Sequence, residues 1–184
     1  DLYWLPLGAG GRSVRVNGIV FERATAFLAR RPACDLYHSA LSVELDGARH
    51  VIEMAPALPH PSKDRGQVLT GPVGARWAGR LAIFRYEVRC WRGGEIPDAE
   101  EAVDSPRLLS TEPEVATEFL TRVPRTPALT WGRDELGLGE MWNSNSVVSW
   151  LIETCGMNAT EICPPEGGRA PGWKAGVTAA GRDL

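Results

Sequence analysis

The clearest supersecondary unit in the chain spans residues 36–54, which read LYHSALSVELDGARHVIEM. Two runs that alternate apolar and polar residues flank Asp46-Gly47, a dipeptide typical of two-residue hairpin turns. The pattern predicts a strand over 36–45 that pairs antiparallel with a strand over 48–54. One face of this hairpin is apolar, and we expect it to join the core through Leu41, Val43, Leu45, Ile52 and Met54.

The other face of the predicted hairpin brings a histidine close to a carboxylate. If Leu45 pairs with Ala48, then Ala40 pairs with Glu53, and His38 lies diagonally opposite that carboxylate. A carboxylate beside a histidine fixes the imidazole tautomer and stabilises the imidazolium, as a general base requires. On the hairpin alone, two polar residues on a solvated strand face are the simpler interpretation.

A second well-marked element is a helix that begins after Asn143 and ends at Gly156. Asparagine is a preferred N-cap, and glycine is a preferred residue just past a helix C-terminus. Apolar residues recur between them at helical spacing: Val147, Val148, Leu151, Ile152 and Cys155. This placement puts Ser144 in the first turn, where the helix dipole and free backbone N–H groups favour an anion.

Local patterns predict the remaining elements. They are a hairpin over 14–21, helices over 21–31 and 111–123, a strand over 81–91, and a Pro/Gly-rich surface loop over 55–75. The helix over 111–123 is expected to start with a capping box, Thr111 to Glu114. Strands with helices at both ends, and no strand–helix–strand repeat, indicate an α+β fold in which an antiparallel sheet packs against helices.

The composition limits the classes of function. A chain of 184 residues with 43% hydrophobic residues is long enough for one folded domain, expected over 1–184. Twenty Lys and Arg against 23 Asp and Glu give a net charge of -3, so no basic field is available for nucleic acid. No apolar run is long enough to span a membrane, and no signal peptide is visible, so a cytoplasmic location is expected.

The four cysteines argue against a metal site. They form no Cys-x-x-Cys pair, and no histidine stands beside them at metal-ligand spacing. They are also too sparse for a disulfide scaffold, so we expect reduced thiols. The cysteines are Cys34, Cys90, Cys155 and Cys163. Neither a metal nor an organic cofactor is expected, and no pattern indicates an oligomeric state.

Three short blocks follow one another along the chain: Tyr37-His38-Ser39-Ala40-Leu41, Asn143-Ser144-Asn145-Ser146-Val147 and Ala170-Pro171-Gly172-Trp173. Together they resemble the circularly permuted papain-like hydrolases, which include the permuted NlpC-type enzymes, the lecithin:retinol acyltransferase relatives and the PPPDE isopeptidases. The PPPDE pattern runs roughly Tyr-His-x-x-Val, Asn-Cys-x-x-Phe and Ile-Pro-x-Trp. The resemblance implies a papain-like domain whose active site lies between a helix N-terminus and a strand.

The resemblance also implies roles for individual residues. It makes Ser144 the nucleophile, His38 the general base and Glu53 the group that orients His38, in a hydrolase or acyl-transfer enzyme. The substrate would be an amide, ester or thioester of a peptide, protein or acyl group. A second alignment, with the acyltransferase relatives, gives His50 the orienting role. Four residues are candidates to line the substrate cleft, although capping and packing explain them more simply: Trp142, Asn143, Asn145 and Trp173.

The chain departs from the family pattern at the nucleophile, where serine stands in place of cysteine. A thiol has a pKa of about 8.5 and can be ionised by a helix N-terminus and a histidine. A hydroxyl must instead lose its proton in the transition state to a well-aligned base. Three explanations remain open. Ser144 is a working nucleophile, the domain is a silent relative that binds a peptide or acyl group, or Ser144 is an engineered replacement.

Overall fold

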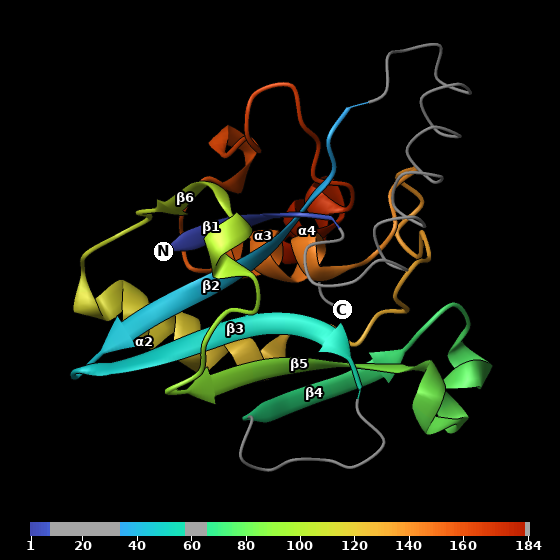
Figure 1. The fold of residues 1–184 in the computed structure, drawn as a ribbon. Coiled ribbons are helices and arrows are strands. Elements are labelled where there is room, and N and C mark those ends of the chain that lie inside the picture. Colours follow the sequence, from blue (N-terminus) through green and yellow to red (C-terminus); the bar gives the residue numbers. More distant parts are fainter. Residues whose placement is uncertain (8–33, 58–65, 183–184) are drawn as a thin grey trace.

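The computed structural model describes residues 1–7, 34–57 and 66–182, which form an α+β fold (Figure 1). Six antiparallel strands make one sheet in the order β4-β5-β3-β2-β1-β6. The strands are β1 (Leu2–Pro6), β2 (Tyr37–Leu45), β3 (Ala48–Pro56), β4 (Gln67–Pro72), β5 (Arg85–Arg92) and β6 (Val103–Arg107). The α-helices are α2 (Pro113–Arg122), α3 (Ser144–Thr154) and α4 (Trp173–Ala180). The predicted α+β class is confirmed. The hairpin predicted over 14–21 and the helix predicted over 21–31 lie outside the described residues.

The central hairpin has the predicted register. Leu45 lies opposite Ala48 beside the turn, and the pairing of β2 with β3 continues without a shift as far as Leu41. Asp46 and Gly47 have φ angles of 51° and 70°, left-handed values that suit a two-residue turn. This register extends the predicted two-face pattern along both strands.

The sheet has two unlike faces. One face packs against the three described α-helices and forms the main core, which contains four of the five apolar residues predicted for the hairpin: Leu41, Val43, Ile52 and Met54. Leu45, beside the turn, is half-buried. The opposite face carries a smaller apolar cluster of Leu5, Ala40, Val51 and Ile96. Consecutive residues of β2 therefore face different surroundings.

Helix α3 begins and ends as predicted. The Asn143 side chain accepts hydrogen bonds from the N–H groups of Asn145 and Ser146, and the Ser146 hydroxyl accepts one from the Asn143 N–H. These bonds form a capping box, which satisfies N–H groups that have no partner within the helix. Gly156 follows the helix with a φ of 81°, the left-handed conformation favoured just past a helix end.

The Pro/Gly-rich stretch over 55–75 is not the continuous loop that its composition predicts. Its second half forms strand β4, which lies at the edge of the sheet and pairs with β5. An edge strand accommodates Gly71 and Pro72 because one of its two sides needs no hydrogen-bond partner. Gly71 also allows a close approach of the Tyr86 ring, which lies 2.3 Å from where a Cβ would stand.

Helix α2 starts later than predicted. Pro113 occupies its first turn and Glu112 its N-cap, and the Glu112 side chain makes no capping hydrogen bond. The Ser110 hydroxyl instead accepts a hydrogen bond from the Glu112 N–H at 3.0 Å. The predicted capping box at Thr111 and Glu114 is therefore wrong, because proline fixes φ and lacks an N–H and so favours the first helical position.

Among the described strands and α-helices, the sequence patterns also miss β1, β6 and α4. The strand predicted over 81–91 begins only at Arg85, because residues 82–84 form a short 3-10 helix, η3 (Ala82–Phe84). Within the described parts of the chain, no helix is both long and apolar enough to cross a membrane.

Candidate functional site

The three sequence blocks meet at the start of helix α3, and Asn145 joins them. Its Nδ2 donates hydrogen bonds to the carbonyl oxygens of Tyr37 and Pro171, both at 2.9 Å. Its Oδ1 accepts a hydrogen bond from the Ser39 hydroxyl at 2.9 Å. Only 2% of Asn145 is exposed, so this amide is a buried group with its donors and its acceptor engaged.

Other polar side chains of α3 and its N-cap residue bind the third block. Asn143 Nδ2 donates to the Pro171 carbonyl at 2.8 Å. The hydroxyls of Ser146 and Ser149 donate to the carbonyl oxygens of Gly172 and Trp173, both at 2.7 Å. These bonds tie the segment that leads into α4 directly to α3. We call the hydrogen bonds of Asn143, Asn145, Ser146 and Ser149 to their partners the α3 network.

Helix α4 also approaches α3 closely. Gly176 lies against α3 so tightly that a Cβ there would come within 2.0 Å of the Ser146 carbonyl oxygen. Gly172 has a φ of 87°, and a Cβ on it would lie 2.5 Å from Asn143 Oδ1. Gly172 is thus required for the close packing of the third block on the second, and Gly176 for the close packing of α4 on α3.

The two tryptophans predicted for the substrate cleft pack within the protein. Trp142 is 1% exposed and belongs to the main core. The Trp173 ring lies against Trp4 with ring centroids 5.0 Å apart, and its Nε1 donates to the Ala159 carbonyl at 2.8 Å. Asn143 and Asn145 are engaged in the α3 network, so all four candidate cleft residues contact the protein itself.

Ser144 is the first residue of α3 and is 8% exposed. In the described part of the chain, no hydrogen bond joins its hydroxyl to His38. The Ser144 position agrees with the prediction of a first-turn residue at a capped helix N-terminus, but the base that a serine nucleophile needs is not aligned with it.

His38 lies on the face of the sheet opposite to α3. Its neighbour Ser39 faces α3, and side chains alternate along a strand. His38 is also paired with Leu5, whose side chain belongs to the smaller cluster on the opposite face. Burial lowers the pKa of His38 to about 4, and the nearby carboxylate of Asp98 partly opposes that shift. The imidazole is therefore neutral at pH 7 and a weak proton acceptor.

Glu53 is held by an arginine. Arg89 Nη1 lies 3.0 Å from Glu53 Oε1, and Arg89 also forms a short ion pair with Glu87. The exposed fractions of the three side chains are 12%, 9% and 6% for Glu53, Arg89 and Glu87. We call these residues the Glu53–Arg89–Glu87 triad. Strand pairing produces it, because β3 sets Glu53 directly opposite Arg89 of β5.

The alternation of residues along 81–91 predicts that Glu87 and Arg89 lie on one face of the strand. It does not predict that Glu53 of the neighbouring strand is their partner. His50, the other candidate for the orienting role, lies opposite Val43 on β2 and therefore on the core side of the sheet. Within the described residues its buried Nδ1 has no hydrogen-bond partner. His38 and His50 thus face opposite sides of the sheet.

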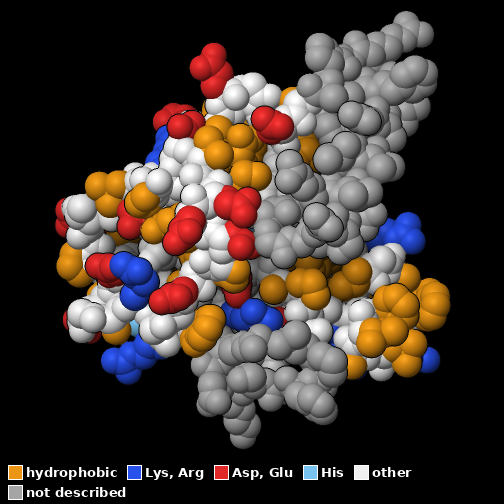
Figure 2. Space-filling model, in the orientation of Figure 1, with side chains coloured by type: hydrophobic (Ala, Val, Ile, Leu, Met, Phe, Trp, Pro, Cys, Tyr) orange, Lys and Arg blue, Asp and Glu red, His pale blue; other side chains and the backbone are white. Residues whose placement is uncertain are grey.

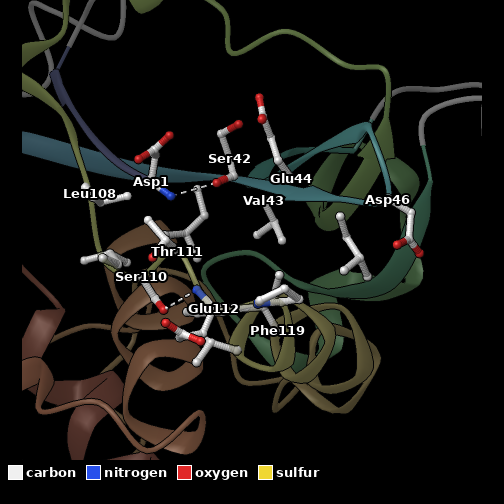
Figure 3. A pocket seen from close by; sticks show the side chains of 16 residues that line it. Asp1, Ser42, Val43, Glu44, Asp46, Leu108, Ser110, Thr111, Glu112 and Phe119 are labelled. Carbon is white, nitrogen blue, oxygen red and sulfur yellow. Dashed lines mark hydrogen bonds between the residues drawn. The ribbon is translucent and has the colours of Figure 1, made fainter.

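The structure contains a groove between β2 and α2 (Figure 3). Its volume is about 360 Å³, within the usual range for ligand sites. Val43 and Phe119 face one another across its floor, from β2 and α2 respectively. Carboxylates stand around it, and none of the described residues that line it is Lys or Arg; the acidic members are Asp1, Glu44, Asp46 and Glu112.

A second, more open hollow of about 730 Å³ lies beside the loop between β5 and β6. It is also acidic: its described lining residues include one arginine, Arg49, and the carboxylates Glu95, Asp98, Glu100 and Glu101. In the described parts of the chain, no cluster of three or more His, Cys, Asp or Glu side chains is arranged to hold a metal ion.

Comparison with known proteins finds no relative for this chain: no family model, no curated protein and no solved structure matches it.

Proposed function

We propose that this protein is a catalytically silent, permuted papain-like fold that binds a peptide. The observation that carries the proposal is the placement of His38 on the face of β2 opposite to Ser39 and helix α3. A serine hydroxyl at a helix N-terminus is not ionised in advance, so hydrolysis requires a base in direct contact with it. Ser144 has no such contact with His38 among the described residues.

The partner of Glu53 supports the same conclusion. In a Ser–His–Glu arrangement the carboxylate binds the imidazole and stabilises its charged form. Here Arg89 binds Glu53, and Glu87 completes the charge compensation. Among the described residues, His38 therefore has no carboxylate hydrogen-bonded to its imidazole, and burial lowers its pKa although Asp98 partly opposes that shift.

The groove between β2 and α2 favours a peptide over an acyl group with a free carboxylate. Its floor is apolar, and the carboxylates of Asp46 and Glu112 stand beside it, with neither lysine nor arginine among its described lining residues. Such a site attracts a cation and repels an anion. We therefore expect a segment that places an apolar side chain next to a lysine or arginine.

A fluorophosphonate probe tests the silent character of the site. We expect no labelling of Ser144 in the intact protein, because no base activates its hydroxyl. Labelling would be followed by mass spectrometry, with Ser144→Ala as the matched control. Labelling that disappears in Ser144→Ala would contradict the proposal and favour the hydrolase instead.

Binding to the groove is tested with a library of short peptides that combine leucine or phenylalanine with lysine or arginine. Asp46→Asn with Glu112→Gln removes two carboxylates whose side chains make no hydrogen bond in the described structure, and we expect about a tenfold loss of affinity. Glu166→Gln, an exposed carboxylate outside the groove, should leave affinity unchanged. Equal affinity for all three proteins would exclude this groove as the site.

A further inference from the structure

An apolar surface stands out at the far end of strands β4 and β5. Residues 76–85 form two short 3-10 helices, η2 (Arg76–Arg80) and η3, followed by the first residue of β5. Their large apolar side chains are exposed, by 74% for Trp77, 55% for Leu81, 76% for Ile83 and 41% for Phe84. We call residues 76–85 the knob. Figure 2 shows it as hydrophobic side chains gathered at the right-hand side of the molecule.

The knob is an ordered structure with defined internal bonds. The N–H groups of Leu81 and Phe84 donate to the carbonyls three residues earlier, at 2.9 and 3.0 Å. The Val73 N–H donates to the Phe84 carbonyl at 2.8 Å and closes the base of the knob on β4. Ala78 is buried, and Gly79 packs so closely that a Cβ would lie 2.8 Å from Pro72. The fold therefore presents these apolar side chains outward in a fixed arrangement.

The knob is also basic. Three arginines belong to it, Arg76, Arg80 and Arg85, and all three are exposed. Residues 66–86 contain no aspartate or glutamate, although the whole chain carries a net charge of -3. Arg76 pairs with Glu135 at 2.9 Å, whereas Arg80 and Arg85 have no carboxylate partner among the described residues. The knob is a local positive region on an acidic protein.

Arg133 adds a further positive charge at the base of the knob. Its Nε donates to the carbonyl of Gly74, two residues before Arg76. Arg85 Nε likewise donates to the Gly79 carbonyl at 2.5 Å, which leaves the rest of that guanidinium available to another acceptor. Backbone carbonyls thus anchor Arg85 and Arg133 beside the apolar side chains.

We propose that the knob docks on the surface of an anionic lipid bilayer. Tryptophan prefers the headgroup region, aliphatic side chains enter the acyl boundary, and arginines bind lipid phosphates. The charge of the knob complements that of an anionic membrane. A protein interface of standard size buries about 800 Å² on each partner. The four apolar side chains at the tip of the knob form a small projecting surface. Such a surface suits insertion between lipids better than it suits an interface of that size.

This docking gives the molecule an orientation. The knob lies at the right of Figure 1, and helix α2, which lines the groove, lies at the left. The acidic groove would be kept away from an anionic surface, which repels it. The proposal rests on the knob alone and does not require that the groove bind a peptide.

Vesicle flotation tests the proposal with the full chain. We expect binding to phosphatidylcholine vesicles that contain phosphatidylglycerol, and about tenfold weaker binding to phosphatidylcholine alone or at high salt. Trp77→Ser with Ile83→Ser should reduce binding at least about tenfold, because apolar insertion is lost. Arg80→Gln should weaken binding only to the anionic vesicles.

Matched controls are Leu108→Ser, which changes an exposed leucine outside the knob, and Arg92→Gln, which changes an exposed arginine at the opposite end of β5. Both should bind vesicles as the unchanged chain does. Thermal unfolding checks that each variant is folded. The proposal is overturned if the intact chain does not bind anionic vesicles, or if Trp77→Ser with Ile83→Ser binds equally well. It is also overturned if sedimentation shows a dimer that this double variant abolishes, because the knob would then contact a second copy.

Discussion

The two faces of the sheet carry two different kinds of polar cluster. On the α3 face, Asn145 and its neighbours form a neutral network that joins three segments distant in the sequence. On the opposite face, Glu53, Arg89 and Glu87 form a charged triad within two adjacent strands. The residues of a predicted catalytic site are divided between these faces, with Ser144 beside the first and Glu53 within the second. Residues that are adjacent in a sequence block therefore need not belong to the same site, because consecutive residues of a strand point to opposite faces of the sheet.

The largest expected effect comes from the charged triad. Arg89→Met leaves two largely buried carboxylates without a counter-charge, so we expect a loss of about 3–5 kcal/mol in the free energy of unfolding. Urea denaturation measures this change. The triple replacement Glu53→Gln, Glu87→Gln and Arg89→Met removes the charges together and should recover most of the loss. A loss below about 1 kcal/mol for Arg89→Met would mean that the carboxylates are not desolvated.

The neutral network should respond less strongly. Asn145→Ala leaves the Tyr37 carbonyl and the Ser39 hydroxyl without this partner, so we expect a loss of about 2–3 kcal/mol in the free energy of unfolding. Asn158→Ala serves as the control, because Asn158 is exposed and its bonds are local. A cost equal to that of the control would show that water replaces Asn145 and that the three blocks do not depend on it.

His38 provides the smallest effect and a test by pH. Its pKa is about 4 in the fold against 6.5 for the free side chain, so the unfolded state binds a proton first as the pH falls. The part of the free energy of unfolding that depends on neutral His38 is fully present above pH 6.5. It is lost progressively as the pH falls towards 4. Because His38 is partly exposed, we expect a loss of about 2 kcal/mol in the free energy of unfolding, which is less than the full pKa difference would give.

The measurement compares unfolding of the intact protein and of His38→Gln from pH 7.5 to 4. The intact protein should lose more stability over this range, since glutamine has no proton to gain. If the free energy of unfolding changes equally with pH in both proteins, His38 is in contact with solvent and is not a weakened base.

Several elements could be predicted because their signals are local. The turn of the central hairpin depends on Asp46-Gly47, and the register follows from the turn. Helix α3 begins at a side-chain cap and ends at a glycine, both within a few residues of the helix. Strand β1 has no such marker, since it exists only by pairing with β2 and β6 on either side. Edge strand β4 was obscured by Gly71 and Pro72, which an edge tolerates.

In the candidate site, too, the features that depend on local sequence could be predicted, and those that depend on remote segments could not. Sequence pattern alone placed Ser144 in the first turn of a capped helix and set His38 and Glu53 on one face of a hairpin, because both depend on neighbours close in the chain. The partners of these groups depend on contacts between remote segments: Arg89 is 36 residues from Glu53, and Asn145 is 106 residues from Ser39. The packing of β3 against β5 therefore gives Glu53 an arginine partner, and the packing of β2 against α3 gives Asn145 a structural role. Local periodicity cannot specify such choices, since hydrogen bonds and ion pairs form between whichever side chains the fold brings within reach.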